Sequence, residues 1–535
     1  MALRVNFNFE AAASQTAIVK NERDMNKSLL RLSTGLRILN AADDSAGLFI
    51  ADQLSVVSSG LEEGNKNIQT GLSALRIAES SAGQIFDRLN EIYKRTVRAA
   101  NDINDPNARS SLQREIDNFI DAIKKIGTDT EYNGIKLLDG TFAQRYIHYG
   151  ARKDQVLEVN ISSVLPNDIG AYLAKGQGAI YNSGTSATTN TTFSAQLGTT
   201  SNWLVDSGDY VGVAGIRALS YDGTQRFVDA ATLAKNINSN KDLQALGIEA
   251  VAKNTNKADQ AFTGFANFYA INDPNGDGSA SLTSVTLNFY IGNADAAGSA
   301  TFTVTIDSSI TSVQQLADAI NTQASGANAP ISAKVVNNKL VLETNNGETI
   351  AVKVGINGTI GSGDSIAIKL NQVLEGAPNV TFDNTNKYAY YIDVGTIDIA
   401  GIDTYKLDYN GVSASNQGFN FNITSGSYAT AKNLYAVNVL TNEEAEESML
   451  IVKKALQRVD SVRAQIGAVM NNLQSIYDSQ KVAQDNTREA ENVIRNTDYA
   501  EEMTNFTKLQ IKMQSSMAML AQANQLPQLV LQLLR

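Results

Sequence analysis

Two periodic apolar segments, one near each end of the chain, restrict the fold more than any other feature. In the N-terminal segment an apolar or small residue returns at every seventh position: Leu54, Leu61, Ile68, Leu75, Ala82 and Leu89. In the C-terminal segment the apolar residues recur three or four positions apart: Val452, Leu456, Val459, Val462, Ile466, Val469, Leu473 and Ile476. This spacing is typical of a long helix that packs along another helix. We therefore predict two long helices that pair with each other.

Four glycines interrupt the N-terminal segment: Gly60, Gly64, Gly71 and Gly83. Each costs about 1 kcal/mol relative to alanine in an exposed helix, because the flexible glycine backbone loses more entropy on folding. Packing, rather than intrinsic helix propensity, must therefore hold this helix.

Shorter apolar stripes lie closer to both termini. Their members are Ile18, Met25, Leu29, Leu32 and Leu36 at one end, and Phe506, Leu509, Met513, Met517 and Leu520 at the other. A single amphipathic helix of this size is marginal in water, because nucleation is costly and its apolar face stays wet. We expect these ten residues to be buried by partners.

The last part of the chain has the length of a membrane span but not its chemistry. Residues 513–534 carry no formal charge, yet they contain several glutamines together with Asn524 and Pro527. Lipid offers these polar groups no partners, so we predict a protein interface and no membrane insertion. The N-terminal sequence MALRVNFNFEAAASQ lacks the basic and apolar regions of a cleaved signal peptide, so export would need another route.

The middle of the chain has a different composition. Between about residues 171 and 430 it is rich in Gly, Thr, Ser, Asn and alternating β-forming residues, which predicts short strands. Within it, segments 230–254 and 313–337 align without a gap as a helix followed by a strand. The aligned pairs include Leu233 with Leu316, Asn238 with Asn321, and Ala250 with Ala333. The predicted class is therefore α+β and multidomain, with β-rich domains inserted between helical ends.

Composition argues against most catalytic and nucleic-acid functions. The formal net charge is −11 and the pI is near 4.9, which disfavours nucleic acid as a partner. There is no cysteine, and the only histidine is His148, in a predicted surface strand. Thiolate and multi-histidine metal centres are thereby excluded, as are cysteine nucleophiles. No nucleotide-binding motif is present, so we expect neither an enzyme nor a cofactor.

One segment partly matches a metal-binding loop. Asp273, Asn275 and Asp277, followed by Gly278, fit the first half of the D-x-[DN]-x-[DN]-G calcium pattern. The twelfth position is Ser284, where the pattern requires a bidentate glutamate, and strands rather than helices flank the loop. A calcium site and a simple turn both remain open interpretations of this segment.

Both ends of the sequence carry motifs of one known family. RLSTGLRILNAADDSAGLFIADQL, SVRAQIGAVMNNLQS and AENVIRNTDYAEEM closely resemble motifs of bacterial flagellin, the subunit of the flagellar filament, and they occur in the family's order. The N-terminal signature residues are Arg31, Gly35, Leu36, Asp43, Asp44 and Gly47. Those of the C-terminal motif are Gly467, Ala468 and Asn471.

The resemblance implies a domain plan. Segments 1–40 and 500–535 would pair as a coiled-coil inner-tube domain, and 41–170 with 435–499 would form an outer-tube helical domain with a β-hairpin. Segment 171–434 would hold the variable, surface-exposed β-rich domains. Helix packing in the outer tube would use Leu54, Leu61, Ile68, Leu75, Leu89, Val459, Ile466, Gly467, Ala468, Asn471 and Leu473. The signature from Asp43 to Gly47 would form the spoke at which the chain changes direction between the tubes.

The resemblance also implies a function and its partners. The chain would polymerise with itself, through the ten residues of the terminal stripes, into the extracellular filament that acts as a propeller for swimming. Type III export without a cleaved signal peptide, a cytoplasmic export chaperone on the C-terminal helix, and flagellar cap and hook-associated partners would follow. Two alternatives stay open from sequence: a hook–filament junction protein and an adhesin displayed on the filament.

Overall fold

The computed structural model describes most of the chain. The described residues are 8–101, 103–179, 190–193, 210–220, 229–274, 276–292, 299–384, 388–410 and 418–533. They divide into two compact units, of which the first comprises residues 1–80, 130–162 and 463–535, and the second residues 81–129 and 163–462. Helices at the two ends and a β-rich middle confirm the α+β class predicted from the sequence.

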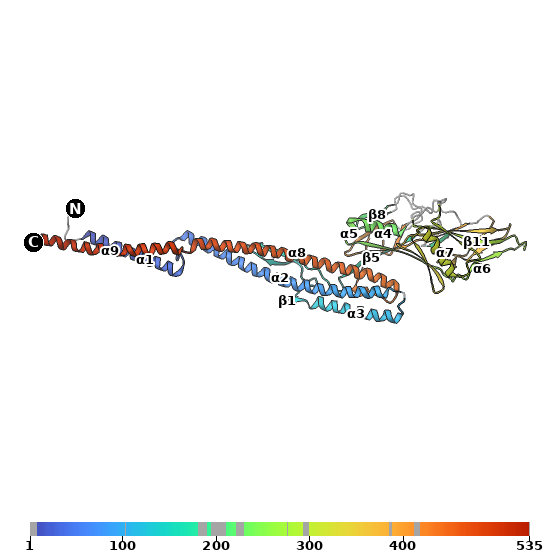
Figure 1. The fold of residues 1–535 in the computed structure, drawn as a ribbon, viewed down its shortest axis with the longest axis horizontal. Coiled ribbons are helices and arrows are strands. Elements are labelled where there is room, and N and C mark those ends of the chain that lie inside the picture. Colours follow the sequence, from blue (N-terminus) through green and yellow to red (C-terminus); the bar gives the residue numbers. More distant parts are fainter. Residues whose placement is uncertain are drawn as a thin grey trace. The chain divides into compact units, whose positions relative to one another are not determined.

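Long helices form both ends of the chain, as predicted. They are α1 (Phe9–Thr34), α2 (Ser45–Ala99), α3 (Pro106–Asp129), α8 (Asn442–Arg495) and α9 (Tyr499–Leu533). In the first unit α1 and α9 lie side by side and run antiparallel, so that the start of α1 lies beside the end of α9 (Figure 1).

The first unit also pairs the beginning of α2 with the end of α8. Asn65 donates to Gln484 at 3.3 Å, and Arg463 and Glu79 form an ion pair at 3.1 Å. Higher residue numbers in α2 therefore meet lower numbers in α8, so this pair is antiparallel too. The parts of the two predicted long helices that belong to the first unit therefore pair with each other.

Three of the four glycines in α2 allow a β-hairpin to approach the helix. The hairpin consists of β3 (Arg145–His148) and β4 (Val156–Val159). A Cβ atom on Gly60 would lie 2.7 Å from the Cβ of Ala151, and one on Gly71 would lie 2.5 Å from the Cδ1 of Ile147. A Cβ on Gly64 would collide with the backbone carbonyl of Tyr149. Packing of the hairpin therefore accounts for these three glycines, which intrinsic helix propensity disfavours.

Besides β3 and β4, further strands and short helices, joined by loops, lie between α3 and α8 in the sequence. They are β1 (Glu131–Tyr132), β2 (Ile135–Lys136), β5 (Gly170–Ala179), β6 (Asn190–Phe193), β7 (Tyr210–Val213), β8 (Ile216–Ser220), α4 (Ala230–Ser239), α5 (Lys241–Ala245), β9 (Glu249–Lys257), α6 (Phe265–Phe268), β10 (Tyr269–Asn272), β11 (Ser281–Ile291), β12 (Phe302–Ile306), α7 (Val313–Gly326), β13 (Ile331–Val336), β14 (Lys339–Thr344), β15 (Ile350–Thr359), β16 (Ser365–Ile368), η2 (Leu370–Gln372), β17 (Val380–Phe382), β18 (Tyr388–Asp393), β19 (Thr396–Gly401), β20 (Lys406–Tyr409), β21 (Gly418–Phe421), β22 (Ser427–Tyr428), β23 (Thr430–Asn433) and η3 (Leu434–Ala436).

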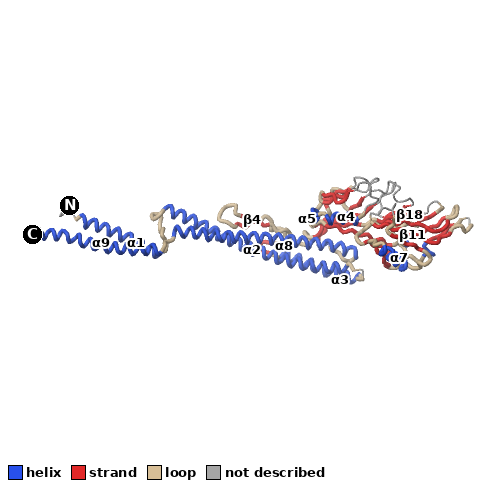
Figure 2. Tube along the Cα trace, turned by 45° about the horizontal axis from the view of Figure 1, so that its top comes forward, coloured by secondary structure: helices blue, strands red, loops and turns tan. Residues whose placement is uncertain are grey.

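The insert in the second unit is built mainly on two sheets (Figure 2). One has seven strands in the order β13-β14-β9-β19-β5-β21, with β23 also pairing with β5. The other has five strands in the order β12-β11-β15-β18-β6. Smaller sheets join β22-β20-β7-β8 and β10-β16-β17. All pairings within these sheets are antiparallel, which suits the short connections of an all-β insert.

The two aligned segments of the insert adopt the same local structure. In each, a helix (α4 or α7) is followed by a strand (β9 or β13). The Asn238 side chain donates to the carbonyl of Ala250 and accepts from its N–H, at 2.7 and 2.8 Å. Asn321 makes both bonds to Ala333, each at 2.7 Å. The same asparagine thus fastens the helix to the next strand in both copies.

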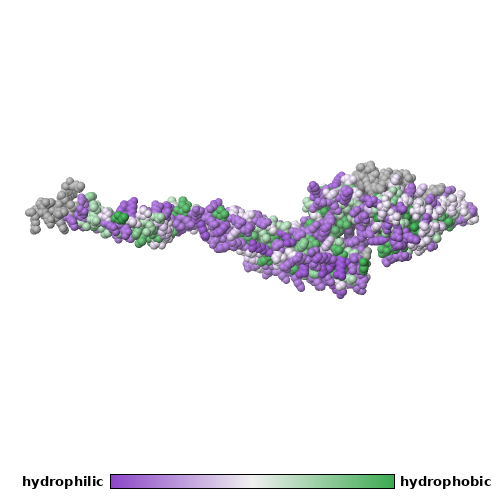
Figure 3. Space-filling view, in the orientation of Figure 1, coloured by the Kyte–Doolittle hydropathy of each residue, from purple (hydrophilic) through white to green (hydrophobic). Residues whose placement is uncertain are grey.

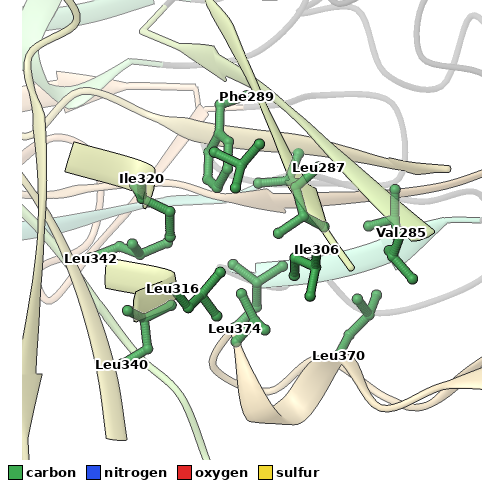
Figure 4. Packing of buried hydrophobic residues seen from close by; sticks show 14 of the residues in the cluster. Val285, Leu287, Phe289, Ile306, Leu316, Ile320, Leu340, Leu342, Leu370 and Leu374 are labelled. Atoms are coloured by element: carbon green, nitrogen blue, oxygen red, sulfur yellow. The ribbon is translucent and has the colours of Figure 1, made fainter. Parts of the chain in front are cut away.

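A well-packed core lies beside α7. Alternate residues of β11 (Val285, Leu287 and Phe289) point toward Leu316 and Ile320, one turn apart on α7 (Figure 4). These five side chains have no exposed surface. Leucines from β14 and from the segment around η2 close the other sides of the cluster. The alternation of β11 and the helical spacing of α7 are the patterns that make one apolar face per element.

Candidate functional site

The α1–α9 pair keeps much of its apolar surface in contact with water. Of the ten positions predicted from the terminal stripes, Leu29 is 52% exposed and Met517 is 49% exposed. The others are half-buried: Ile18, Met25, Leu32, Leu36, Phe506, Leu509, Met513 and Leu520. Six further apolar side chains of the pair are exposed, and the sequence analysis missed them: Phe9, Val19, Leu30, Met503, Ile511 and Met519. Figure 3 shows hydrophobic patches on this pair.

Polar contacts between the two helices are few in the part of the pair that the structure describes. Asn8 donates to the carbonyl of Ala523 at 2.8 Å, and Asn21 donates to Ser516 at 3.1 Å. Ser28 and Arg31 both contact Glu502, through a hydrogen bond to its carbonyl at 3.5 Å and an ion pair at 3.8 Å. The pairing of these helices within one chain therefore leaves an apolar surface on both, because two isolated helices cannot cover each other on all sides.

A sharp corner connects α1 to α2. Gly35 ends α1 in the left-handed conformation, at φ +72°, and its N–H donates to the carbonyl of Arg31 at 2.8 Å. A Cβ atom at this glycine would lie 3.1 Å from the hydroxyl of Tyr499. The residue after it, Leu36, forms an isolated bridge with Asn496. Glycine is required here because other residues rarely adopt a positive φ.

Asp44 begins the next helix. Its carboxylate accepts the backbone N–H of Gly47 at 2.8 Å, which satisfies one of the free donors at the start of α2. A Cβ atom on Gly47 would collide with this carboxylate and lie 2.9 Å from Ile38. The small residue after the aspartate therefore lets the cap close over the first turn.

Asp43 fastens the corner to α1. Its carboxylate forms an ion pair with Lys27 at 2.6 Å and accepts the backbone N–H of Leu39 at 3.1 Å. The hydrogen bond from Lys27 is the main reason why the pKa of Asp43 lies below its usual value, and the bond from Leu39 adds to it. Lys27 and Ile38 had no signal in the sequence, since only the folded corner brings them to the aspartates.

The predicted packing positions along the long helices fall into two groups. Seven are buried within the chain: Leu61, Ile68, Leu75, Leu89, Val459, Ile466 and Leu473. Leu54 and Gly467 are half-buried, whereas Ala468 and Asn471 are exposed. No described atom lies within 4 Å of the position that a Cβ on Gly467 would take, apart from the neighbouring residues and the backbone of its own helix. Contacts within one chain therefore explain the first group and not Gly467, Ala468 and Asn471.

The predicted calcium ligands are only partly described. Asp273 and Asp277 lie in the loop between β10 and β11, near Asp364, which the sequence analysis did not single out. Asn275 lies outside the described residues.

Comparisons with known proteins agree at both ends of the chain. The bacterial flagellin N-terminal helical region matches residues 5–143, and the C-terminal helical region matches residues 449–534. Flagellins of Aquifex aeolicus and Aquifex pyrophilus are 46% and 47% identical, in alignments that cover 100% of this chain and of each relative. This chain belongs to the bacterial flagellin family.

More distant flagellins match over their whole length as well. The B-type flagellin of Pseudomonas aeruginosa is 30% identical, again with 100% of both chains covered. Because these full-length relatives are flagellins, the junction-protein and adhesin alternatives are not favoured. Overall superposition on solved structures is low: FliC from Burkholderia pseudomallei has 13% identity and a TM-score of 0.28, covering 75% of this chain and 99% of that chain.

Among the residues that the structure describes, no helix combines the length and the apolar character needed to cross a bilayer.

Proposed function

We propose that this flagellin is the subunit of a bacterial flagellar filament and that it polymerises through the surface of α1 and α9. The observation that carries the proposal is the set of exposed apolar side chains on this helix pair. It includes Leu29 and Met517, which belong to the predicted polymerisation contacts. Large exposed apolar side chains gathered on one helix pair usually mark a protein interface.

The energy available from this surface is comparable with the cost of association. Eight exposed side chains on the pair would each gain about 1 kcal/mol or more when their remaining surface is buried. Together they would contribute on the order of 10 kcal/mol per subunit, which must offset the entropy lost on association. A helical polymer is one symmetric arrangement in which every subunit can gain this energy.

We further propose that the segments take the places implied by the family. Segments 1–40 and 500–535 would form the inner tube, and 41–170 with 435–499 the outer tube. Segment 171–434 would face the medium. The corner from Gly35 to Gly47 would turn the chain between the two tubes, and its caps and ion pair support this role. The exposed Ala468 and Asn471, with Gly467, would contact neighbouring subunits.

The partners and location follow as parts of the same proposal. The apolar face of α9 would be covered by an export chaperone in the cytoplasm and by other subunits after export. The assembled filament would be extracellular and would end at cap and hook-associated proteins.

The test is polymerisation of purified chain with filament seeds, followed by light scattering and electron microscopy. We expect filaments from the full chain and none from a chain lacking residues 1–40 and 500–535. Replacement of a single exposed apolar residue of α9, as in Met517→Glu or Ile511→Glu, should also block growth, because the charge would be buried without a partner. Leu246→Glu is the matched control, since Leu246 is similarly exposed but lies in the insert.

Normal filament growth by both α9 variants would contradict the assembly surface. Failure of the wild-type chain to extend seeds would contradict the filament function itself.

A further inference from the structure

Three carboxylates from two distant segments meet at one edge of the three-stranded sheet. Asp273 and Asp277 lie between β10 and β11, and Asp364 directly precedes β16. Strands β10 and β16 are antiparallel, and the last pair of their ladder joins Asn272 to Ser365. The register therefore places Asp273 opposite Asp364. One oxygen from each of the three carboxylates lies within 4.8 Å of the other two.

Asp364 is buried, and one of its carboxylate oxygens lacks a hydrogen-bond partner among the described residues. Its side chain is 3% exposed. One oxygen, Oδ2, accepts a hydrogen bond from the hydroxyl of Ser279 at 2.7 Å. The other, Oδ1, is buried and has no hydrogen-bond partner among the described residues. A buried carboxylate oxygen without a partner is costly, and a cation held between the three carboxylates would offset that cost.

The ligand chemistry selects the type of cation. All three side chains offer oxygen, which suits Ca²⁺ and Mg²⁺ rather than Zn²⁺ or Cu²⁺. Opposite ligands lie up to about 5 Å apart around Ca²⁺ but only about 4 Å apart around Mg²⁺, given their metal–oxygen distances. The three oxygens all lie within 4.8 Å of one another, a separation that the coordination sphere of Ca²⁺ spans.

The sequence and the hydrogen bonds of the β10–β11 loop also favour calcium. Asp273, Asp277 and Gly278 occupy the first, fifth and sixth positions of the calcium pattern. The N–H groups of Gly276 and Gly278 donate to Asp273 at 2.6 and 2.9 Å, which curls the loop around this carboxylate. The pattern's twelfth residue is a serine within β11. Asp364, from the neighbouring strand, provides the third carboxylate in its place.

We propose that Asp273, Asp277 and Asp364 form a calcium site that ties the β10–β11 loop to the start of β16. The site goes beyond filament assembly, because all three residues lie in the insert and none is on α1 or α9.

Equilibrium dialysis of the full-length chain against radioactive Ca²⁺ tests the proposal. The wild type should show one saturable site, with a Kd of about 10⁻⁴ to 10⁻³ M as in extracellular calcium modules. Asp364→Asn should weaken binding about tenfold or more, because it removes one ligand charge. Asp277→Asn should do the same, and since Asp277 is exposed its replacement does not disturb the core.

Asp307→Asn is the matched control. Like Asp277, which accepts the backbone N–H of Ser279 at 2.8 Å, Asp307 accepts that of Ser309 at 2.8 Å. Asp307 lies outside the carboxylate cluster. Its replacement should leave calcium binding unchanged.

Three results would overturn the calcium site. The first is that the wild type shows no saturable binding up to about 10 mM Ca²⁺, which is well above the weakest expected Kd. The second is that both cluster variants bind Ca²⁺ with wild-type affinity. The third is that Mg²⁺ competes for the site as well as Ca²⁺ does. Seeded polymerisation measured on the same samples separates such a failure from a failure of the filament proposal.

Discussion

At the scale of single residues, two helical glycines of this flagellin have opposite surroundings. Gly64 faces the backbone of the β3–β4 hairpin, whereas a Cβ on Gly467 would meet no described atom within 4 Å. Gly64→Ala should lower the free energy of unfolding by about 1 to 3 kcal/mol, because the hairpin must move away. Gly467→Ala should raise it by up to about 1 kcal/mol in the monomer through helix propensity.

Chemical denaturation of the monomers, monitored by circular dichroism, measures both changes. Equal effects of the two substitutions would contradict the packing role of Gly64.

A buried carboxylate makes the stability of the insert depend on pH. Burial raises the pKa of Asp393 to about 7, although a hydrogen bond from Asn256 at 2.8 Å opposes the shift. The unfolded chain releases this proton near the usual value of 3.8, whereas the folded chain keeps it up to about pH 7. This group therefore favours folding most at low pH. Its contribution falls, by about 4 kcal/mol, as pH rises between the two pKa values.

Asp393→Asn should remove this loss, because the amide does not ionise and its oxygen still accepts from Asn256. The measurement is the unfolding free energy of the insert at several pH values between 4 and 8. Parallel pH profiles for the wild type and the variant would show that Asp393 does not titrate as expected.

At the scale of elements, the helix–strand unit is the recurring part of the insert. In α7, Asn321 satisfies both backbone groups of Ala333, which is buried at the start of β13. Asn321→Ala would leave this donor and this acceptor without partners and should cost about 1 to 3 kcal/mol. Asn238→Ala should have the same sign, since Asn238 makes the same pair of bonds in the other copy.

Gln323→Ala is a suitable control, because Gln323 is an exposed residue of the same helix. Thermal unfolding of the three variants gives the comparison. A change for Asn321→Ala no larger than that for Gln323→Ala would disprove the fastening role.

At the scale of the whole molecule, the two compact units should unfold separately. Each has its own internal contacts, and the β-rich unit contains two hydrophobic clusters of its own. Differential scanning calorimetry of the monomer should therefore show at least two transitions, because separate cores rarely melt as one cooperative unit. A single transition whose calorimetric and van't Hoff enthalpies agree for the full chain would contradict this expectation.

The sequence by itself determined the features that depend on local period and composition. The stripes that contain Leu61 and Ile466 predicted long paired helices, because 3.6-residue periodicity places such residues on one face whatever the partner is. The matching Asn238 and Asn321 revealed the repeat, because both copies need the same bonds. The terminal motifs indicated the family before any contact was known.

Only the tertiary structure decided which distant residues meet. The partner of Gly64 is a hairpin backbone that follows much later in the chain, and the partner of Asp43 is Lys27, across the corner. Asp364 reaches Asp273 through the β10–β16 register, which no local pattern encodes. Strand register and loop packing depend on how apolar side chains are buried over the whole insert. The sequence alone therefore does not identify Asp364 as the third carboxylate of the proposed site.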